Sequence, residues 1–131
     1  RNDNPRMNAR VDFEVNQPQK ILLTSKEINK ESNFFKSGDV IINNSPDLNK
    51  VIAELSNTEI NSILVEAGPN LVNAFLDNYL VDEIIIYKSN ITLGDEGVSW
   101  FENKTIESLG FDLKSSLKIN GDSKETYLKR S

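Results

Sequence analysis

The 131 residues of this chain are enough for one domain with its own core, and 37% hydrophobic with 27% charged residues is an ordinary globular composition. A net charge of −5 without any Lys/Arg run argues against nucleic acid or an anionic membrane as partner. The absence of Cys excludes disulfides and thiolate catalysis and fits a cytoplasmic protein, while the absence of His removes the commonest general base and metal ligand. Acid–base chemistry must therefore fall to Asp, Glu, Lys, Tyr or water.

The first third of the chain predicts two strands and a helix. The compact apolar run over residues 20–24 favours a buried strand, and residues 25–39 form a polar surface connection. A second short strand is predicted over residues 40–42, ended by Asn-Asn-Ser-Pro. Residues 47–56 then predict a helix, because four apolar residues recur at helical spacing: Leu48, Val51, Ile52 and Leu55.

The next segment predicts a strand that leads directly into a helix. An apolar run over residues 62–65 favours a buried, central strand, and it ends at Glu66. Gly68 as N-cap and Pro69 as first helical residue favour a helix start, followed by an amphipathic segment through Leu80. Open α/β sheets bind ligands at the carboxyl ends of their strands, and helix N-termini favour anions. The segment therefore predicts a phosphate cradle beside a candidate acid.

The second half of the chain predicts an antiparallel end to the sheet. Residues 83–87 indicate another buried strand, and residues 125–129 form the return strand of a hairpin whose turn is Asn120-Gly121. The strand before that turn is predicted to be half-exposed, because its apolar residues alternate with polar ones: Phe111, Leu113, Leu117 and Ile119. Strands that alternate with helices and end in a hairpin indicate an α/β domain with a mixed sheet.

Three motifs carry a family resemblance, and they occur in the family's order. They are Asp3-Asn4-Pro5-Arg6-Met7-Asn8-Ala9-Arg10, then Val65-Glu66-Ala67-Gly68-Pro69 with Leu71 and the Leu80-Val81-Asp82-Glu83 strand entry, then Thr92-Leu93-Gly94 ahead of Trp100-Phe101. Together they resemble the reductase domain of the bifunctional riboflavin-biosynthesis deaminase-reductase. The similarity runs from Asp3 almost to the C-terminus.

The resemblance implies a fold, an activity and an assembly. The fold would be dihydrofolate-reductase-like, a mixed sheet flanked by helices and ending in a C-terminal β-hairpin. The activity would be NADPH-dependent reduction of 5-amino-6-(5-phosphoribosylamino)uracil by a homodimer. We expect residues 1–131 to be a single reductase domain without the family's first strand and helix and without the upstream deaminase domain, which would leave apolar surface exposed and favour self-association. Zinc deaminase chemistry itself needs His and Cys ligands, which this chain lacks.

The resemblance also implies roles for individual residues. Glu66 would be the catalytic residue. The substrate would be bound by Met7, Arg10 and Glu66, and the Arg10 guanidinium suits a ribose phosphate. Asn70 replaces the family's usual Thr, and Asn73 stands where the family often has Gly. The cofactor-binding residues would be Asp3, Ser25, Gly68, Pro69, Asn70, Leu71, Val72, Asn73 and Ala74.

Other interpretations stay open at this point. Glu66 could simply cap the following helix, and Arg10 could be an ordinary surface charge. The chain could be a related reductase of a pterin-like substrate, or a non-catalytic dimerisation or ligand-binding fragment. The pairs Phe34-Phe35 and Trp100-Phe101 indicate core-covering aromatics rather than stacking platforms, since neither lies among basic residues. No metal site is expected, because Asp95-Glu96 has no further ligand cluster around it.

Overall fold

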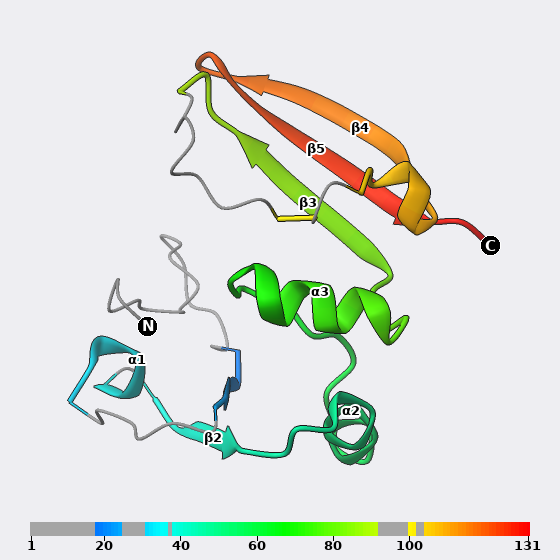
Figure 1. The fold of residues 1–131 in the computed structure, drawn as a ribbon. Coiled ribbons are helices and arrows are strands. Elements are labelled where there is room, and N and C mark those ends of the chain that lie inside the picture. The colour runs from blue at the N-terminus through cyan, green and yellow to red at the C-terminus, as the bar shows by residue number, and fades with distance from the viewer. Residues whose placement is uncertain (1–17, 25–30, 37, 92–99, 102–103) are drawn as a thin grey trace. The chain divides into compact units, whose positions relative to one another are not determined.

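The computed structural model describes residues 18–24, 31–36, 38–91, 100–101 and 104–131 (Figure 1). The chain divides into two compact units, Arg1–Leu55 and Ser56–Ser131. Their elements in chain order are β1 (Lys20–Leu23), α1 (Asn33–Lys36), β2 (Val40–Asn43), α2 (Leu48–Ser56), α3 (Pro69–Asp77), β3 (Glu83–Lys88), the 3₁₀ helix η2 (Glu107–Leu109), β4 (Phe111–Ile119) and β5 (Asp122–Lys129). Among the described helices, none has the length and apolar character needed to cross a membrane.

The first unit contains a two-stranded parallel sheet. Strands β1 and β2 pair with Ile21 opposite Ile41, so both predicted strands are confirmed. The side chains of Ile41 and Ile42 are 44% and 42% exposed, however, so β2 is largely exposed although its residues are apolar. A parallel strand becomes buried only when other elements cover both of its faces, which the sequence of the strand cannot specify.

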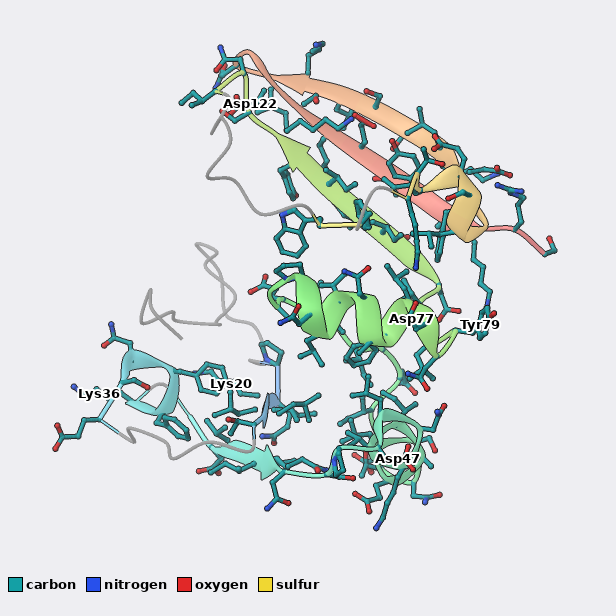
Figure 2. The ribbon with its side chains drawn as sticks, in the orientation of Figure 1. Lys20, Lys36, Asp47, Asp77, Tyr79 and Asp122 are labelled. Carbon is teal, nitrogen blue, oxygen red and sulfur yellow. The ribbon has the colours of Figure 1, made fainter. Side chains whose placement is uncertain are left out.

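A buried lysine joins β1 to α1. The Lys20 ammonium donates a hydrogen bond to the Phe34 carbonyl over 3.0 Å and lies 5.5 Å from the centroid of the Phe34 ring (Figure 2). Both residues are buried, and the Phe35 ring meets Phe34 edge to face. Phe34 therefore lies in the core of this unit, and the partly buried Phe35 covers it, as predicted for this pair. The buried charge of Lys20 is satisfied by a carbonyl dipole and an aromatic face.

Helix α2 follows the predicted pattern. Its first turn is capped by Asp47, whose carboxylate accepts a hydrogen bond from the Lys50 backbone N–H over 3.2 Å. Leu48 and Val51 are buried, and Ile52 and Leu55 are partly buried. The apolar residues at helical spacing thus form the inward face of the helix.

The second unit contains an antiparallel sheet in which β5 lies between β3 and β4 (Figure 1). The β4–β5 hairpin turns at Asn120 and Gly121, whose φ angles of 48° and 87° place both in the left-handed region. Asn and Gly adopt that conformation at low cost, and two such residues match the twist of a tight hairpin. The predicted hairpin is confirmed, although β5 begins at Asp122, just after the turn (Figure 2).

One face of this sheet carries the core of the unit. Helix α3 and η2 contribute to it together with the sheet, around the buried side chains of Leu76, Ile106, Phe111 and Tyr127. The predicted strand over residues 83–87 is confirmed as β3, but its burial alternates: Ile84 and Ile86 pack on the core, whereas Ile85 and Tyr87 are 42% and 69% exposed. Its continuous apolar run therefore does not mark a strand covered on both faces.

The prediction of a central strand over residues 62–65 is wrong. These residues form no strand, and among the described strands of both sheets none pairs with them. Ile63 and Leu64 are 44% and 74% exposed. An apolar, β-branched run supplies strand propensity, but a strand forms only where its N–H and C=O groups meet a neighbouring strand. That neighbour is missing from the sheets described here.

Candidate functional site

The N-terminus of α3 forms as its sequence dictates. Gly68 is the N-cap with extended backbone, φ −72° and ψ 171°, and Pro69 is the first helical residue. The first helical hydrogen bond runs from the Val72 N–H to the Gly68 carbonyl, over 3.1 Å. Among the described residues, no side-chain hydrogen bond caps this end. The N–H groups of Asn70 and Leu71 therefore lack an intrahelical acceptor, and the positive end of the helix dipole is available to an anion.

Gly68 leaves open space in front of this helix end. A Cβ atom added at Gly68 would meet no described heavy atom within 4 Å, and its backbone angles suit any residue. The fold itself therefore places no demand for glycine at this position. A demand for glycine would instead come from a ligand that approaches the backbone closely.

The predicted cofactor residues of α3 divide by burial. Asn70 is exposed at the first turn, whereas Val72 packs against the core and Asn73 is only 8% exposed. The Asn73 amide donates hydrogen bonds to the carbonyls of Pro69, over 2.8 Å, and Trp100, over 2.7 Å. The side chains of Val72 and Asn73 thus serve the packing of the helix, so a ligand at this turn would meet them only through backbone groups.

Glu66 lies two residues before the N-cap of α3. Its side chain is exposed, in the extended segment that replaces the predicted strand. An exposed carboxylate is accessible to a substrate, and the short connection through Ala67 keeps it close to the helix N-terminus. Chain continuity, rather than a strand end, holds Glu66 beside the N-terminus of α3.

Asp3, Met7, Arg10 and Ser25 lie outside the described residues, as do residues 92–96, which include the Thr-Leu-Gly motif and the acidic pair. Within the described part of the chain, no group of three or more Asp or Glu side chains is arranged to hold a metal ion.

A polar network on the sheet was missed by sequence reasoning. The Tyr127 hydroxyl donates a hydrogen bond to the Glu125 carboxylate, which also pairs with the Lys88 ammonium at 2.5 Å. Hydrogen bonding to Lys88, and then to Tyr127, lowers the pKa of Glu125, and the bond to Glu125 raises the pKa of Tyr127 to about 12. The alternation of side chains along a strand predicts that Glu125 and Tyr127 lie on one face of the sheet. Their partner Lys88 on β3 could not be predicted, because it depends on the register between the two strands.

Comparisons with known proteins agree with one another. The chain matches the family described as RibD C-terminal domain over residues 1–124. It is 30% identical over 128 residues to the riboflavin biosynthesis protein RibD of Buchnera aphidicola subsp. Baizongia pistaciae, covering 83% of this chain. It is 36% identical over 72 residues to the 5-amino-6-(5-phosphoribosylamino)uracil reductase of Buchnera aphidicola subsp. Acyrthosiphon pisum, covering 52% of this chain. The chain spans only 34% and 35% of the length of these relatives.

The fold agrees with solved structures of the same family. Form 1 of Acinetobacter baumannii RibD superposes with a TM-score of 0.84 at 21% identity, covering 98% of this chain and 44% of that one. Form 2 gives a TM-score of 0.81 at 20% identity, covering 96% of this chain and 43% of that one. The predicted dihydrofolate-reductase-like α/β fold is confirmed. The likeness in sequence extends over nearly the whole chain and includes the helix start at Gly68, and the chain belongs to the RibD C-terminal domain family.

Proposed function

We propose that this chain forms the reductase part of an enzyme that reduces 5-amino-6-(5-phosphoribosylamino)uracil with NADPH in riboflavin biosynthesis. The observation that carries the proposal is the family match over residues 1–124, together with a relative that bears the name of this reductase. The exposed Glu66 immediately before the helix start at Gly68 and Pro69 is compatible with it.

The first turn of α3 has the properties that a dinucleotide phosphate requires. Its uncapped N–H groups can donate to phosphate oxygens, and Gly68 leaves room for close approach. Residues 68–74 would therefore hold NADPH, and the family resemblance adds Asp3 and Ser25 to the residues that would bind it. When bound, that cofactor supplies the hydride that reduces the ribose carbon bearing the amino group. The chain's own part is to bind, orient and exclude water.

The substrate roles fall to Glu66, Arg10 and Met7. In this proposal the Glu66 carboxyl group orients the sugar-amine end of the substrate and delivers a proton there, as a positioned acid does. The Arg10 guanidinium holds the phosphate through paired hydrogen bonds, and Met7 contacts the substrate without exchanging protons. The sequence contains no His or Cys, so we assign the proton transfer to the carboxyl group of Glu66.

We also propose a cytoplasmic homodimer with a small-molecule substrate and neither nucleic acid nor a membrane as partner. The absence of Cys fits a reducing compartment, and the negative charge disfavours polyanions. Tyr87 and Leu117 both pair with Lys124 in the strand register, so their side chains lie on the sheet face opposite the core. Both side chains are exposed, which gives this face an apolar surface. Such a face suits burial against a second copy.

The test of the catalytic proposal is a steady-state assay with the full-length protein. NADPH oxidation should depend on the phosphoribosylamino-uracil and should yield its ribitylamino product, identified by mass. Oxidation with a dihydropterin but not with the uracil compound would move the assignment to a pterin reductase. Binding of either ligand without turnover would leave a ligand-binding fragment instead.

A further inference from the structure

Asn73 is a buried polar side chain inside a helix, and its amide joins two segments that lie 27 residues apart in the sequence. Both amide hydrogens have acceptors, the Pro69 carbonyl at 2.8 Å and the Trp100 carbonyl at 2.7 Å. Asn is a poor helix former, and burying an amide costs free energy unless it is hydrogen-bonded. These two hydrogen bonds offset that cost, and they tie the Trp100 segment to helix α3.

The result is that Trp100 is held at the first turn of α3. Pro69 is the first residue of that helix, and the carbonyls of Pro69 and Trp100 are each one hydrogen bond away from the same Asn73 nitrogen. The next residue, Phe101, packs against the core of the unit. The Trp100–Phe101 segment is therefore anchored twice, through a backbone carbonyl and through a buried ring.

Trp100 itself is not used by the core. Its side chain is 49% exposed, so the prediction of a core-covering aromatic holds for Phe101 and not for Trp100. The hydrogen bond from Asn73 holds the Trp100 backbone beside the N-terminal half of α3, the half that carries the uncapped helix end. Indole rings stack on planar aromatic rings, and a stacked ring contributes binding without requiring a matching hydrogen-bond pattern.

We infer that Trp100 flanks the bound nicotinamide dinucleotide and stacks on one of its planar rings, and that Asn73 is the positioning residue that holds Trp100 there. The inference rests on the proposed function for its cofactor. The N–H groups at the helix end donate hydrogen bonds to the phosphates, and Trp100 contacts a ring beside them. The two contacts therefore involve different parts of one ligand. The Asn73 side chain acts through Trp100 and does not itself touch the cofactor.

The inference is tested by fluorescence, because Trp100 is the single tryptophan of this sequence. NADPH absorbs where tryptophan emits, so a cofactor bound against Trp100 quenches its emission and gains emission of its own by energy transfer. NADPH is titrated into the full-length protein and into its Trp100→Phe variant. The difference between the two titrations isolates the Trp100 signal from that of any other tryptophan.

Two substitutions separate positioning from stacking. Asn73→Ala removes both hydrogen bonds, and Trp100→Ala removes the ring but keeps them, because they use the Trp100 backbone carbonyl. The matched control is Asn78→Ala. Asn78 makes the same kind of bond to the residue four before it, Nδ2 to the Ala74 carbonyl at 2.8 Å, but it is exposed at the opposite end of the helix.

Asn73→Ala and Trp100→Ala should each raise the NADPH dissociation constant by roughly five- to tenfold, as expected for the loss of one well-placed contact, and leave the KM for the uracil substrate within about twofold. Asn73→Ala should also lose most of the energy transfer, which a general loss of stability would not remove from the folded fraction. Asn78→Ala should bind NADPH as the parent protein does.

Three results would overturn the inference. NADPH binding to the parent without any change in Trp100 emission would place the indole elsewhere and leave the proposed reductase intact. Parent-like NADPH affinity in folded Asn73→Ala would also overturn the inference and leave the proposed reductase intact. If Asn73→Ala does not fold, parent-like affinity in Trp100→Ala would have the same consequence. No NADPH binding to the parent by calorimetry would remove both the proposed cofactor and this inference.

Discussion

Tyr127 donates a hydrogen bond to the carboxylate of Glu125 two positions earlier on β5, and the same carboxylate pairs with Lys88 on β3. Residues two apart on a strand share a face, so the three side chains form one network on the face that carries the core. The Tyr127 ring is buried in that core, and its hydroxyl is satisfied at the core's edge. The network thus couples the charge of Glu125 to the stability of the sheet.

The first prediction concerns the pH dependence of stability. The pKa of Glu125 is lowered in the folded state, so its contribution is present above the ordinary carboxyl pKa and is lost as pH falls through the lowered value. The pKa of Tyr127 is raised to about 12, so its contribution is present below about 10 and is lost as pH rises through about 12. Urea unfolding across this pH range should show both losses.

Two variants serve as controls for this dependence. Tyr127→Phe should cost about 1 kcal/mol at neutral pH and flatten the alkaline limb, because it removes the hydroxyl while keeping the ring. Glu125→Gln should flatten both limbs, since it removes the carboxylate shared by both partners. An alkaline limb that persists in Tyr127→Phe would assign it to another group.

The second prediction separates chemistry from packing at Glu66. Glu66→Gln keeps the shape of an exposed side chain and removes only its charge and acid function, so the fold should be unchanged. A positioned acid or base contributes roughly 10²–10⁴-fold in rate, and kcat should fall by about that factor. Arg10→Ala should instead raise KM for the substrate, because a phosphate clamp acts in ground and transition states alike. Parent-like turnover in Glu66→Gln would return this residue to helix capping.

The third prediction uses the space at Gly68. Gly68→Val should fold with nearly unchanged stability, because the added Cβ meets no described heavy atom within 4 Å and the extended backbone before Pro69 suits a β-branched residue. Its affinity for NADPH should nevertheless fall by tenfold or more, since the new side chain occupies the approach to the helix end. Thermal shift with and without NADPH measures both quantities.

Gly110 provides the opposite control. Its φ of 93° is in the left-handed region, so Gly110→Ala should cost about 1–2 kcal/mol of stability. The NADPH-dependent shift of the folded variant should stay as in the parent. A full NADPH shift in Gly68→Val would move the cofactor site away from α3.

The fourth prediction concerns self-association through the open face of the second sheet. Leu117→Lys places a charge among exposed apolar side chains and should weaken dimerisation by roughly tenfold or more, as measured by sedimentation. Leu64→Lys is the matched control, because Leu64 is even more exposed but lies outside every described strand. A parent protein that stays monomeric at high concentration would contradict the proposed dimer.

Much of this protein follows from local sequence chemistry. Gly68 and Pro69 start α3 because the ring of proline suits the first helical position, where no N–H is needed. Asn120 and Gly121 turn the hairpin because both tolerate left-handed backbone angles. Such features need only neighbouring residues, and the motifs that indicated the family are of the same kind.

The tertiary structure decided what depends on distant partners. Residues 62–65 have strand propensity but no paired strand, and β3 has a continuous apolar run yet leaves Ile85 and Tyr87 exposed. The bonds of Asn73 to Trp100 and of Lys88 to Glu125 each cross more than twenty positions of sequence. No local pattern encodes these contacts, because sheet register and helix packing determine which side chains meet.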